Sequence, residues 1–116
     1  MKKVLLVDDE LEFTKDLAKG LEIFGYEVYR AGDGVGALNI IEKKKPDIVL
    51  CDYRLFDIDG DKVLEKTKKG HPEIKFIMVT AYYDEDVAKR FRNLGADEVI
   101  FKPIVLTEIE ALLAKL

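Results

Sequence analysis

Five chemically active side chains stand directly after short, largely apolar segments of this sequence. They are three carboxylates, a hydroxyl and an ammonium: Asp8, Asp9, Asp52, Thr80 and Lys102. Short apolar runs bounded by turn formers predict strands that are buried on both faces of a parallel sheet. The carboxyl ends of such strands lie on one edge of the sheet, where ligands bind in open α/β folds. We therefore expect the five side chains to meet in one crevice.

Three carboxylates in one crevice repel one another. At about 5 Å and an effective dielectric constant of about 20, each pair costs about 3 kcal/mol. One lysine cannot offset three such pairs, whereas a divalent cation can, and all-oxygen ligands suit Mg²⁺. The hydroxyl and the ammonium are donors that can hold a phosphoryl group. The set therefore predicts phosphoryl transfer, in which an aspartate can act as the nucleophile and form an aspartyl phosphate.

An alternation of strands and helices must position these side chains. Strands are expected at residues 4–7, 27–31, 47–51, 74–79 and 98–101. A helix is expected after each strand, since apolar residues recur there at helical spacing, as at Phe13, Leu17 and Leu21. The alternation predicts an α/β fold, a doubly wound five-stranded parallel sheet with right-handed crossovers and helices on both faces. The segment 27–31 is half polar, so we expect it at an edge.

Several polar segments predict helix starts. Asp33 and Asp84 are expected to cap the helices that follow them, and the segment 107–110 has the form of a capping box that opens the last helix. The segment 57–61 looks like a calcium loop, but its glycine comes too early and no glutamate stands at the EF-hand distance. We interpret it as a turn and a helix N-cap. The glycine-rich segment 32–36 lacks the spacing of a phosphate-binding loop.

Length and composition are those of an ordinary globular domain. The 116 residues suit one domain over residues 1–116, and 48% apolar with 36% charged residues is typical of this class. The net charge of −4 argues against direct binding to nucleic acid. The N-terminal apolar run is too short for a signal peptide, and no run spans a membrane. Cys51 is the single cysteine, and we expect a buried, inert thiol and a cytoplasmic location.

The motifs taken together resemble the receiver domain of two-component response regulators, the CheY-like superfamily, over essentially the whole chain. The matching segments are an acidic pair, a phosphoacceptor strand with its loop, a switch hydroxyl with a small neighbour, and a lysine before a proline. They stand here as Val7-Asp8-Asp9-Glu10, Asp52 with Asp59-Gly60, Thr80-Ala81 and Lys102-Pro103. The resemblance implies the flavodoxin-like strand order 2-1-3-4-5, which is known from receiver proteins rather than worked out from this sequence, and a cis bond before Pro103.

The resemblance also implies roles for single residues. Asp52 would accept a phosphoryl group from a phosphohistidine, Lys102 would bind that group, and Thr80 would turn inward to meet it. Asp9 and Asp52 would bind Mg²⁺ directly together with the backbone carbonyl of Arg54. Asp8 would bind the ion mainly through water.

The implied function is a phosphorylation-activated signalling switch rather than an ordinary enzyme. The domain would catalyse its own phosphorylation and dephosphorylation. Its partners would be a histidine kinase or a histidine phosphotransfer domain, and an output domain or effector protein. A dimer would form through the face made by the helix after Asp84, the strand at 98–101 and the last helix.

Two residues depart from the family pattern. Phe56 stands where a proline is usual, so the loop after Asp52 is expected to be less rigid or differently oriented. Val99 stands where an aromatic switch residue is usual, so backbone and loop shifts, with Tyr82 or Tyr83, are expected to carry the response. Arg54 and Tyr82 are large residues at positions that flank the path of attacking water, which favours slow self-dephosphorylation. The alternative is that both point to solvent and meet a partner.

Other classes were weighed against this one. A phosphatase of the haloacid dehalogenase type also uses an aspartyl phosphate, but it needs a second aspartate where Arg54 stands and more chain for a cap. A flavodoxin-like cofactor binder shares the topology, but the chain has no phosphate loop for flavin. A pseudo-receiver that binds partners without phosphorylation lacks some of the acidic residues, whereas this chain keeps all of them.

Overall fold

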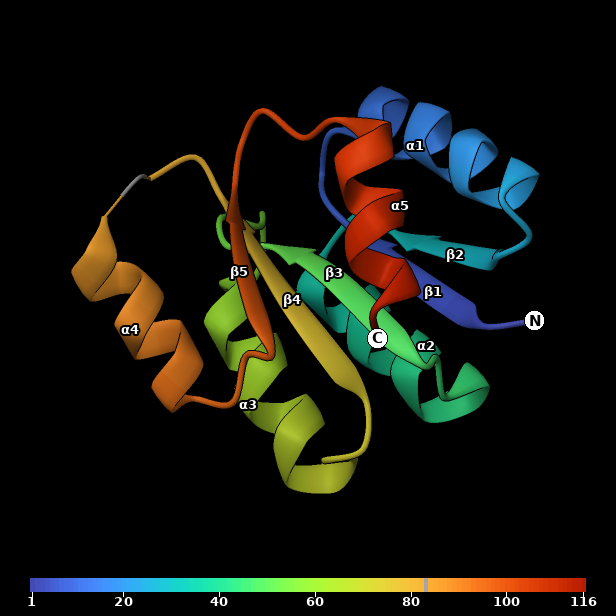
Figure 1. The fold of residues 1–116 in the computed structure, drawn as a ribbon. Coiled ribbons are helices and arrows are strands. Elements are labelled where there is room, and N and C mark those ends of the chain that lie inside the picture. The colour runs from blue at the N-terminus through green and yellow to red at the C-terminus, as the bar shows by residue number, and fades with distance from the viewer. Residues whose placement is uncertain (83) are drawn as a thin grey trace.

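The computed structural model describes residues 1–82 and 84–116, so Tyr83 lies outside the described residues. Five parallel strands form one sheet in the order β2-β1-β3-β4-β5 (Figure 1). They are β1 (Lys3–Val7), β2 (Glu27–Ala31), β3 (Ile48–Asp52), β4 (Lys75–Thr80) and β5 (Glu98–Phe101). The predicted doubly wound α/β fold and its strand order are therefore confirmed, with β2 at an edge.

Helices cover both faces of the sheet (Figure 1). One face carries α1 (Leu11–Ile23) and α5 (Leu106–Ala114), and the other carries α2 (Gly34–Lys44), α3 (Gly60–Gly70) and α4 (Glu85–Asn93). Each face has its own hydrophobic cluster, and alternate residues of a strand contribute to each. In β1, Leu5 and Val7 belong to the cluster with α2, α3 and α4, while Val4 and Leu6 belong to the cluster with α1 and α5. Burial on both sides explains why the strands are continuous apolar runs.

The sheet places the chemically active residues at its carboxyl edge. Asp52 is the last residue of β3 and Thr80 is the last residue of β4. Lys102 directly follows β5, and its backbone N–H donates to the carbonyl of Thr80 at 2.9 Å. The bond between Lys102 and Pro103 is cis, as the family resemblance implies.

Helix ends follow the predicted caps in part. The Asp33 side chain accepts from the N–H of Gly36 at 2.7 Å, and Asp84 caps α4 in the same way. The predicted capping box at the start of the last helix is wrong, because α5 begins at Leu106, two residues earlier than a helix capped by Thr107 would, and has no side-chain cap. Leu106 packs closely on α1, where a Cβ at Gly20 would lie 2.5 Å from its side chain.

Two further predictions from the sequence concern membrane-spanning helices and the thiol of Cys51. Among the residues that the structure describes, none of the helices combines the length and the apolar character needed to cross a bilayer. Cys51 is fully buried in β3, and burial raises the pKa of its thiol well above the usual value. The thiol is therefore an inert part of the core, as predicted.

Candidate functional site

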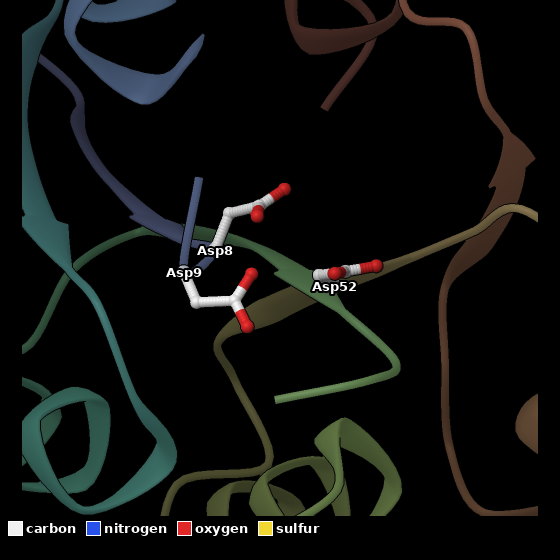
Figure 2. Close-up of side chains that lie close together, drawn as sticks. All are labelled: Asp8, Asp9 and Asp52. Atoms are coloured by element: carbon white, nitrogen blue, oxygen red, sulfur yellow. The ribbon is translucent and has the colours of Figure 1, made fainter. Parts of the chain in front are cut away.

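Three carboxylates gather at the carboxyl edge of the sheet, where β1 and β3 lie side by side (Figure 2). Asp8 and Asp9 come directly after β1, and Asp52 ends β3. One ligand oxygen from each side chain lies within 4.8 Å of the other two. Asp8 and Asp52 are buried, whereas Asp9 is exposed. This is the crowding that the sequence predicts, with two of the three charges withdrawn from water.

Lys102 is the cation within this cluster, and several carboxylates share it. Its Nζ lies 3.1 Å from Oδ2 of Asp8, 3.5 Å from Oδ2 of Asp52 and 3.7 Å from Oε1 of Glu10. Burial disfavours the ammonium, but the neighbouring acids outweigh burial and raise the pKa of Lys102. Glu10 was given no role of its own by the sequence analysis, although its place beside the acidic pair was a signal that could have found it.

The electrostatics of Asp52 show that one lysine is not enough. Burial, the repulsion from Asp8 and a smaller repulsion from Asp9 raise the pKa of Asp52 to about 6, even though Lys102 acts in the opposite direction. Burial and the two neighbouring carboxylates thus outweigh the single lysine at Asp52. A divalent cation at the cluster would supply further positive charge.

Asp52 and Thr80 line the same open pocket, with a volume of about 320 Å³. The other lining residues come from the loops that follow the strands: Asp9, Glu10, Tyr53, Arg54, Ala81, Tyr82 and Lys102. Thr80 is almost fully buried, and its hydroxyl oxygen accepts from the N–H of Tyr82 at 3.0 Å. The hydroxyl proton is thus available to a group bound in the pocket.

The loop after β3 forms one rim of the pocket. The guanidinium of Arg54 lies 4.6 Å from the ring centroid of Tyr53 and 5.6 Å from that of Tyr82. Arg54 also pairs with Asp59 at 3.4 Å across the loop. Arg54 and Tyr82 are exposed, and both line the pocket and contact each other.

Glycine is required where this loop returns to the strand. A Cβ at Gly60 would lie 2.2 Å from the backbone oxygen of Asp52. The N–H of Gly60 also donates to the carbonyl of Tyr53 at 2.6 Å, which closes the base of the loop. The sequence-predicted helix start is correct in position, but Asp59 makes no side-chain cap bond there.

The two departures from the family pattern differ in their surroundings. Phe56 is 89% exposed at the outer part of the loop after β3. Val99 is buried in β5 beside Met78 of β4, within the core cluster on the side of α4. Tyr83, which was named with Tyr82 as a carrier of the response, lies outside the described residues.

The fold and the edge cluster together define a receiver-like α/β domain, with acids, a hydroxyl and a lysine around one open pocket. Residues 4–114 match the response regulator receiver domain family, and the chain belongs to this family. The match covers nearly the whole chain, which favours the receiver class over the haloacid dehalogenase alternative.

Relatives with curated descriptions support the same family. The sporulation initiation phosphotransferase F of Bacillus subtilis is 33% identical over 108 residues, which is 93% of this chain and 87% of that protein. The probable transcriptional regulator ycf27 of Guillardia theta is 39% identical over 112 residues, 95% of this chain but 43% of that protein. The chain thus spans less than half the length of several relatives that it matches.

Solved structures give the same result. A CheY-like response regulator receiver domain protein from Methanospirillum hungatei is 33% identical, with a TM-score of 0.94 over 99% of this chain and 92% of that one. A response regulator from Burkholderia pseudomallei, described as having a phosphorylated aspartic acid, a calcium ion and citrate, is 28% identical. Its TM-score is 0.89 over 96% of this chain and 65% of that one.

Proposed function

We propose that this chain is a phosphorylation-activated switch of a two-component phosphorelay, with Asp52 as its phosphoacceptor. The observation that carries the proposal is the placement of Asp52: it ends β3 in an open pocket, between the carboxylates of Asp8 and Asp9 and the ammonium of Lys102. The phosphodonor is a phosphohistidine of a histidine kinase or of a histidine phosphotransfer protein. The receiver domain comprises residues 1–116.

The donor set of the pocket fits Mg²⁺. Asp9, Asp52 and the backbone carbonyl of Arg54 would hold the ion directly, and Asp8 would hold it through water. Oxygen ligands of this kind suit Mg²⁺, and the ion would offset the repulsion from Asp8 and Asp9 that, together with burial, raises the pKa of Asp52. When bound, the ion would supply positive charge that neutralises the phosphoryl oxygens during in-line transfer. The calcium ion in the Burkholderia pseudomallei relative is consistent with a divalent cation in this family.

The residues of the chain divide the chemistry among them. The carboxylate of Asp52 attacks phosphorus, the bond from phosphorus to the donor imidazole breaks, and an acyl phosphate forms. The ammonium of Lys102, already 3.5 Å from Asp52, binds an oxygen of the transferred group. The buried hydroxyl of Thr80 donates to another. Attack of water on phosphorus then breaks the bond from phosphorus to the Asp52 oxygen, which releases inorganic phosphate and returns Asp52 to its carboxylate.

Membership of the family supports a proposal for the partners and the location. In the cytoplasm, a histidine kinase or a phosphotransfer protein phosphorylates the domain. An output domain or effector protein then responds to its phosphorylation state. The output domain or effector binds the face formed by α4, β5 and α5, and the same face would form a dimer interface. Val99 has no ring to rotate, so backbone and loop shifts near Tyr82 carry the response. We propose no direct binding to nucleic acid or membrane.

Labelling with a small phosphodonor tests the proposal. Wild-type protein incubated with acetyl phosphate and Mg²⁺ is expected to gain one phosphoryl group by intact mass, and to gain none after chelation of the metal. Asp52→Asn is expected to abolish the gain. Asp16→Asn, which removes an exposed carboxylate of α1, is the matched control and is expected to label normally. Undiminished labelling of Asp52→Asn, or no labelling of the wild type, would refute the proposal and leave a pseudo-receiver.

A further inference from the structure

The N-terminus of α2 is capped by two aspartates, one local and one distant. Asp33, at the N-cap, accepts from the N–H of Gly36 at 2.7 Å. The distant one is Asp57, in the loop after β3, whose Oδ1 accepts from the N–H of Gly34 at 2.8 Å and whose Oδ2 accepts from the N–H of Val35 at 2.9 Å. The first three N–H groups of the helix, which have no partner within it, are thus all satisfied.

The distant cap also fixes the loop that carries it. Beside Asp57, the side chain of Ile58 packs so closely on α2 that a Cβ at Gly34 would lie 2.3 Å from it. The base of the loop is closed by Gly60 against Asp52 and Tyr53. The loop is therefore held at two places, by β3 at its base and by α2 farther out. Residue 54 lies between these two places.

The two carboxylate oxygens of Asp57 form strong bonds for an exposed group. The N–H groups of Gly34 and Val35 lower the pKa of Asp57, so the side chain is charged at neutral pH. Charge-assisted bonds at a helix N-terminus gain further from the helix dipole. This attachment also stands next to Phe56, where the family pattern has a proline. A tie to α2 can restrict the loop where no proline ring does so.

We infer that Asp57 is a positioning residue for the metal site: its two bonds to the N-terminus of α2 hold the loop so that the carbonyl of Arg54 faces the carboxylate cluster. This inference rests on the proposed function, since it concerns the Mg²⁺ site assigned there. Asp57 itself touches neither the ion nor the phosphoryl group. Asp57 preorganises the loop, so that the carbonyl of Arg54 is in place before the ion binds.

Two aspartate substitutions at one helix end separate positioning from helix stability. Asp57→Ala removes the bonds to Gly34 and Val35, whereas the matched control Asp33→Ala removes the bond to Gly36 and leaves the loop attached. Mg²⁺ affinity is measured by titration of amide chemical shifts at Tyr53 and Ala81. Asp57→Ala is expected to weaken Mg²⁺ binding about tenfold, as is usual when support behind a metal ligand is lost. Asp33→Ala is expected to keep the wild-type affinity for Mg²⁺. Asp57→Asn retains one acceptor oxygen and is expected to have an intermediate affinity.

A second measurement uses the wild-type protein alone. By linkage, if the cap strengthens metal binding, the metal must strengthen the cap. Amide hydrogen exchange at Gly34 and Val35 is therefore expected to slow on adding Mg²⁺. Exchange at Gly36, which is bonded to Asp33, serves as the internal reference and is expected to change less.

The outcomes are distinct for this inference and for the proposed function. Unchanged Mg²⁺ affinity in Asp57→Ala, or an equal loss in Asp57→Ala and Asp33→Ala, overturns the positioning role while the metal site stands. Unchanged exchange at Gly34 and Val35 also overturns it. Failure of the wild type to bind Mg²⁺, or binding that survives Asp9→Asn and Asp52→Asn, overturns the proposed function and this inference with it.

Discussion

Asp52 lies at the carboxyl ends of the strands and Asp97 at their amino ends, so the two carboxylates lie at opposite edges of the sheet. Each has a lysine beside it. Asp97 immediately precedes β5; its Oδ2 lies 2.7 Å from Nζ of Lys68 and accepts from the N–H of Phe76 at 2.8 Å. Burial alone would raise the pKa of Asp97, but Lys68 and the N–H of Phe76 outweigh it and the pKa is lowered. The pKa of Asp52 is instead raised to about 6.

Burial is the first cause for both carboxyl groups and raises both pKa values, so the difference comes from the neighbouring groups: carboxylates repel Asp52, whereas Lys68 and a backbone N–H stabilise Asp97. Lys68 pairs with one carboxylate and directs its other bonds to backbone carbonyls, including that of Ile74 at 2.6 Å. Lys102 is shared among Asp8, Glu10 and Asp52. One edge therefore holds a satisfied pair that stabilises the fold, while the other holds excess negative charge that a ligand can neutralise.

A destabilising substitution is expected at the satisfied edge. Lys68→Met keeps the length of the side chain but removes the charge-assisted bond to Asp97, which is only partly buried, and we expect a loss of about 2 kcal/mol in the free energy of unfolding. The measurement is urea unfolding at pH 7. Lys62→Met, on the same helix but at an exposed pair, is the control and should change stability by less than about 0.5 kcal/mol. Similar values for the two variants would remove the basis of the comparison.

A stabilising substitution is expected at the crowded edge. The pKa of Asp52 in the folded protein lies above the ordinary 3.8, so the folded state binds the proton more tightly than the unfolded state does. Stability from this group is present below pH 4 and is lost as the pH rises through about 6. Asp52→Asn should therefore stabilise the metal-free protein by about 2 kcal/mol at pH 7, and the gain should vanish toward pH 4.

Substitution of Asp97 should change the free energy of unfolding in the opposite direction to substitution of Asp52. Its lowered pKa means that its contribution is present above the ordinary pKa of an aspartate and is lost as the pH falls. Asp97→Asn should therefore destabilise the protein at pH 7, and the difference from wild type should shrink on acidification. Urea unfolding of both variants in EDTA, at pH 4, 5.5 and 7, gives the two profiles. Parallel profiles for Asp52→Asn and Asp97→Asn would show that the two edges do not differ as described.

The two carboxylates also differ in what covers them, since Arg54 and Tyr82 line the pocket of Asp52. In-line attack on the acyl phosphate needs water opposite the leaving carboxylate, and we expect these side chains to cover that approach. Replacing both by alanine should speed loss of phosphate about tenfold, or about 1.4 kcal/mol in barrier. Decay of the phosphorylated mass is followed after removal of the donor, with Phe56→Ala in the same loop as the control. Equal rates in wild type and double variant would mean that the two side chains serve a partner instead.

The smallest effect is expected for Asp9 in the absence of metal. Asp9 is exposed and is the least of the named influences on the pKa of Asp52, so Asp9→Asn should change metal-free stability by less than about 0.5 kcal/mol. Saturating Mg²⁺ should raise the melting temperature of the wild type by mass action but not that of Asp9→Asn. Thermal melts in EDTA and in Mg²⁺ provide both values. A large shift of the metal-free melt would show that the exposed acid contributes to the crowding as strongly as the buried ones.

The sheet and its edge could be predicted from sequence because they depend on local patterns. An apolar run that ends on Asp52 or Thr80 reports a buried strand and its carboxyl end without any knowledge of distant contacts. Lys102 follows by the same reasoning. Once the strands are parallel, the topology alone brings these residues to one edge.

The contacts that could not be predicted join residues far apart in sequence. Asp57 has the appearance of a turn residue, yet it caps a helix that begins 23 residues earlier. Helix α5 begins at Leu106, which packs into the space beside Gly20 of α1, a contact between residues 86 positions apart that no local pattern reports. Local propensity carries no information about such long-range packing.

The sharing of Lys102 has a consequence for how signals are combined. The acids around the pocket outnumber its cations. Under the proposed function, an anionic phosphodonor would therefore be repelled until a divalent ion is bound, and donor and ion would promote each other's binding. The domain would then respond only when both are present, and the concentration of the ion would set how strongly it responds to the donor.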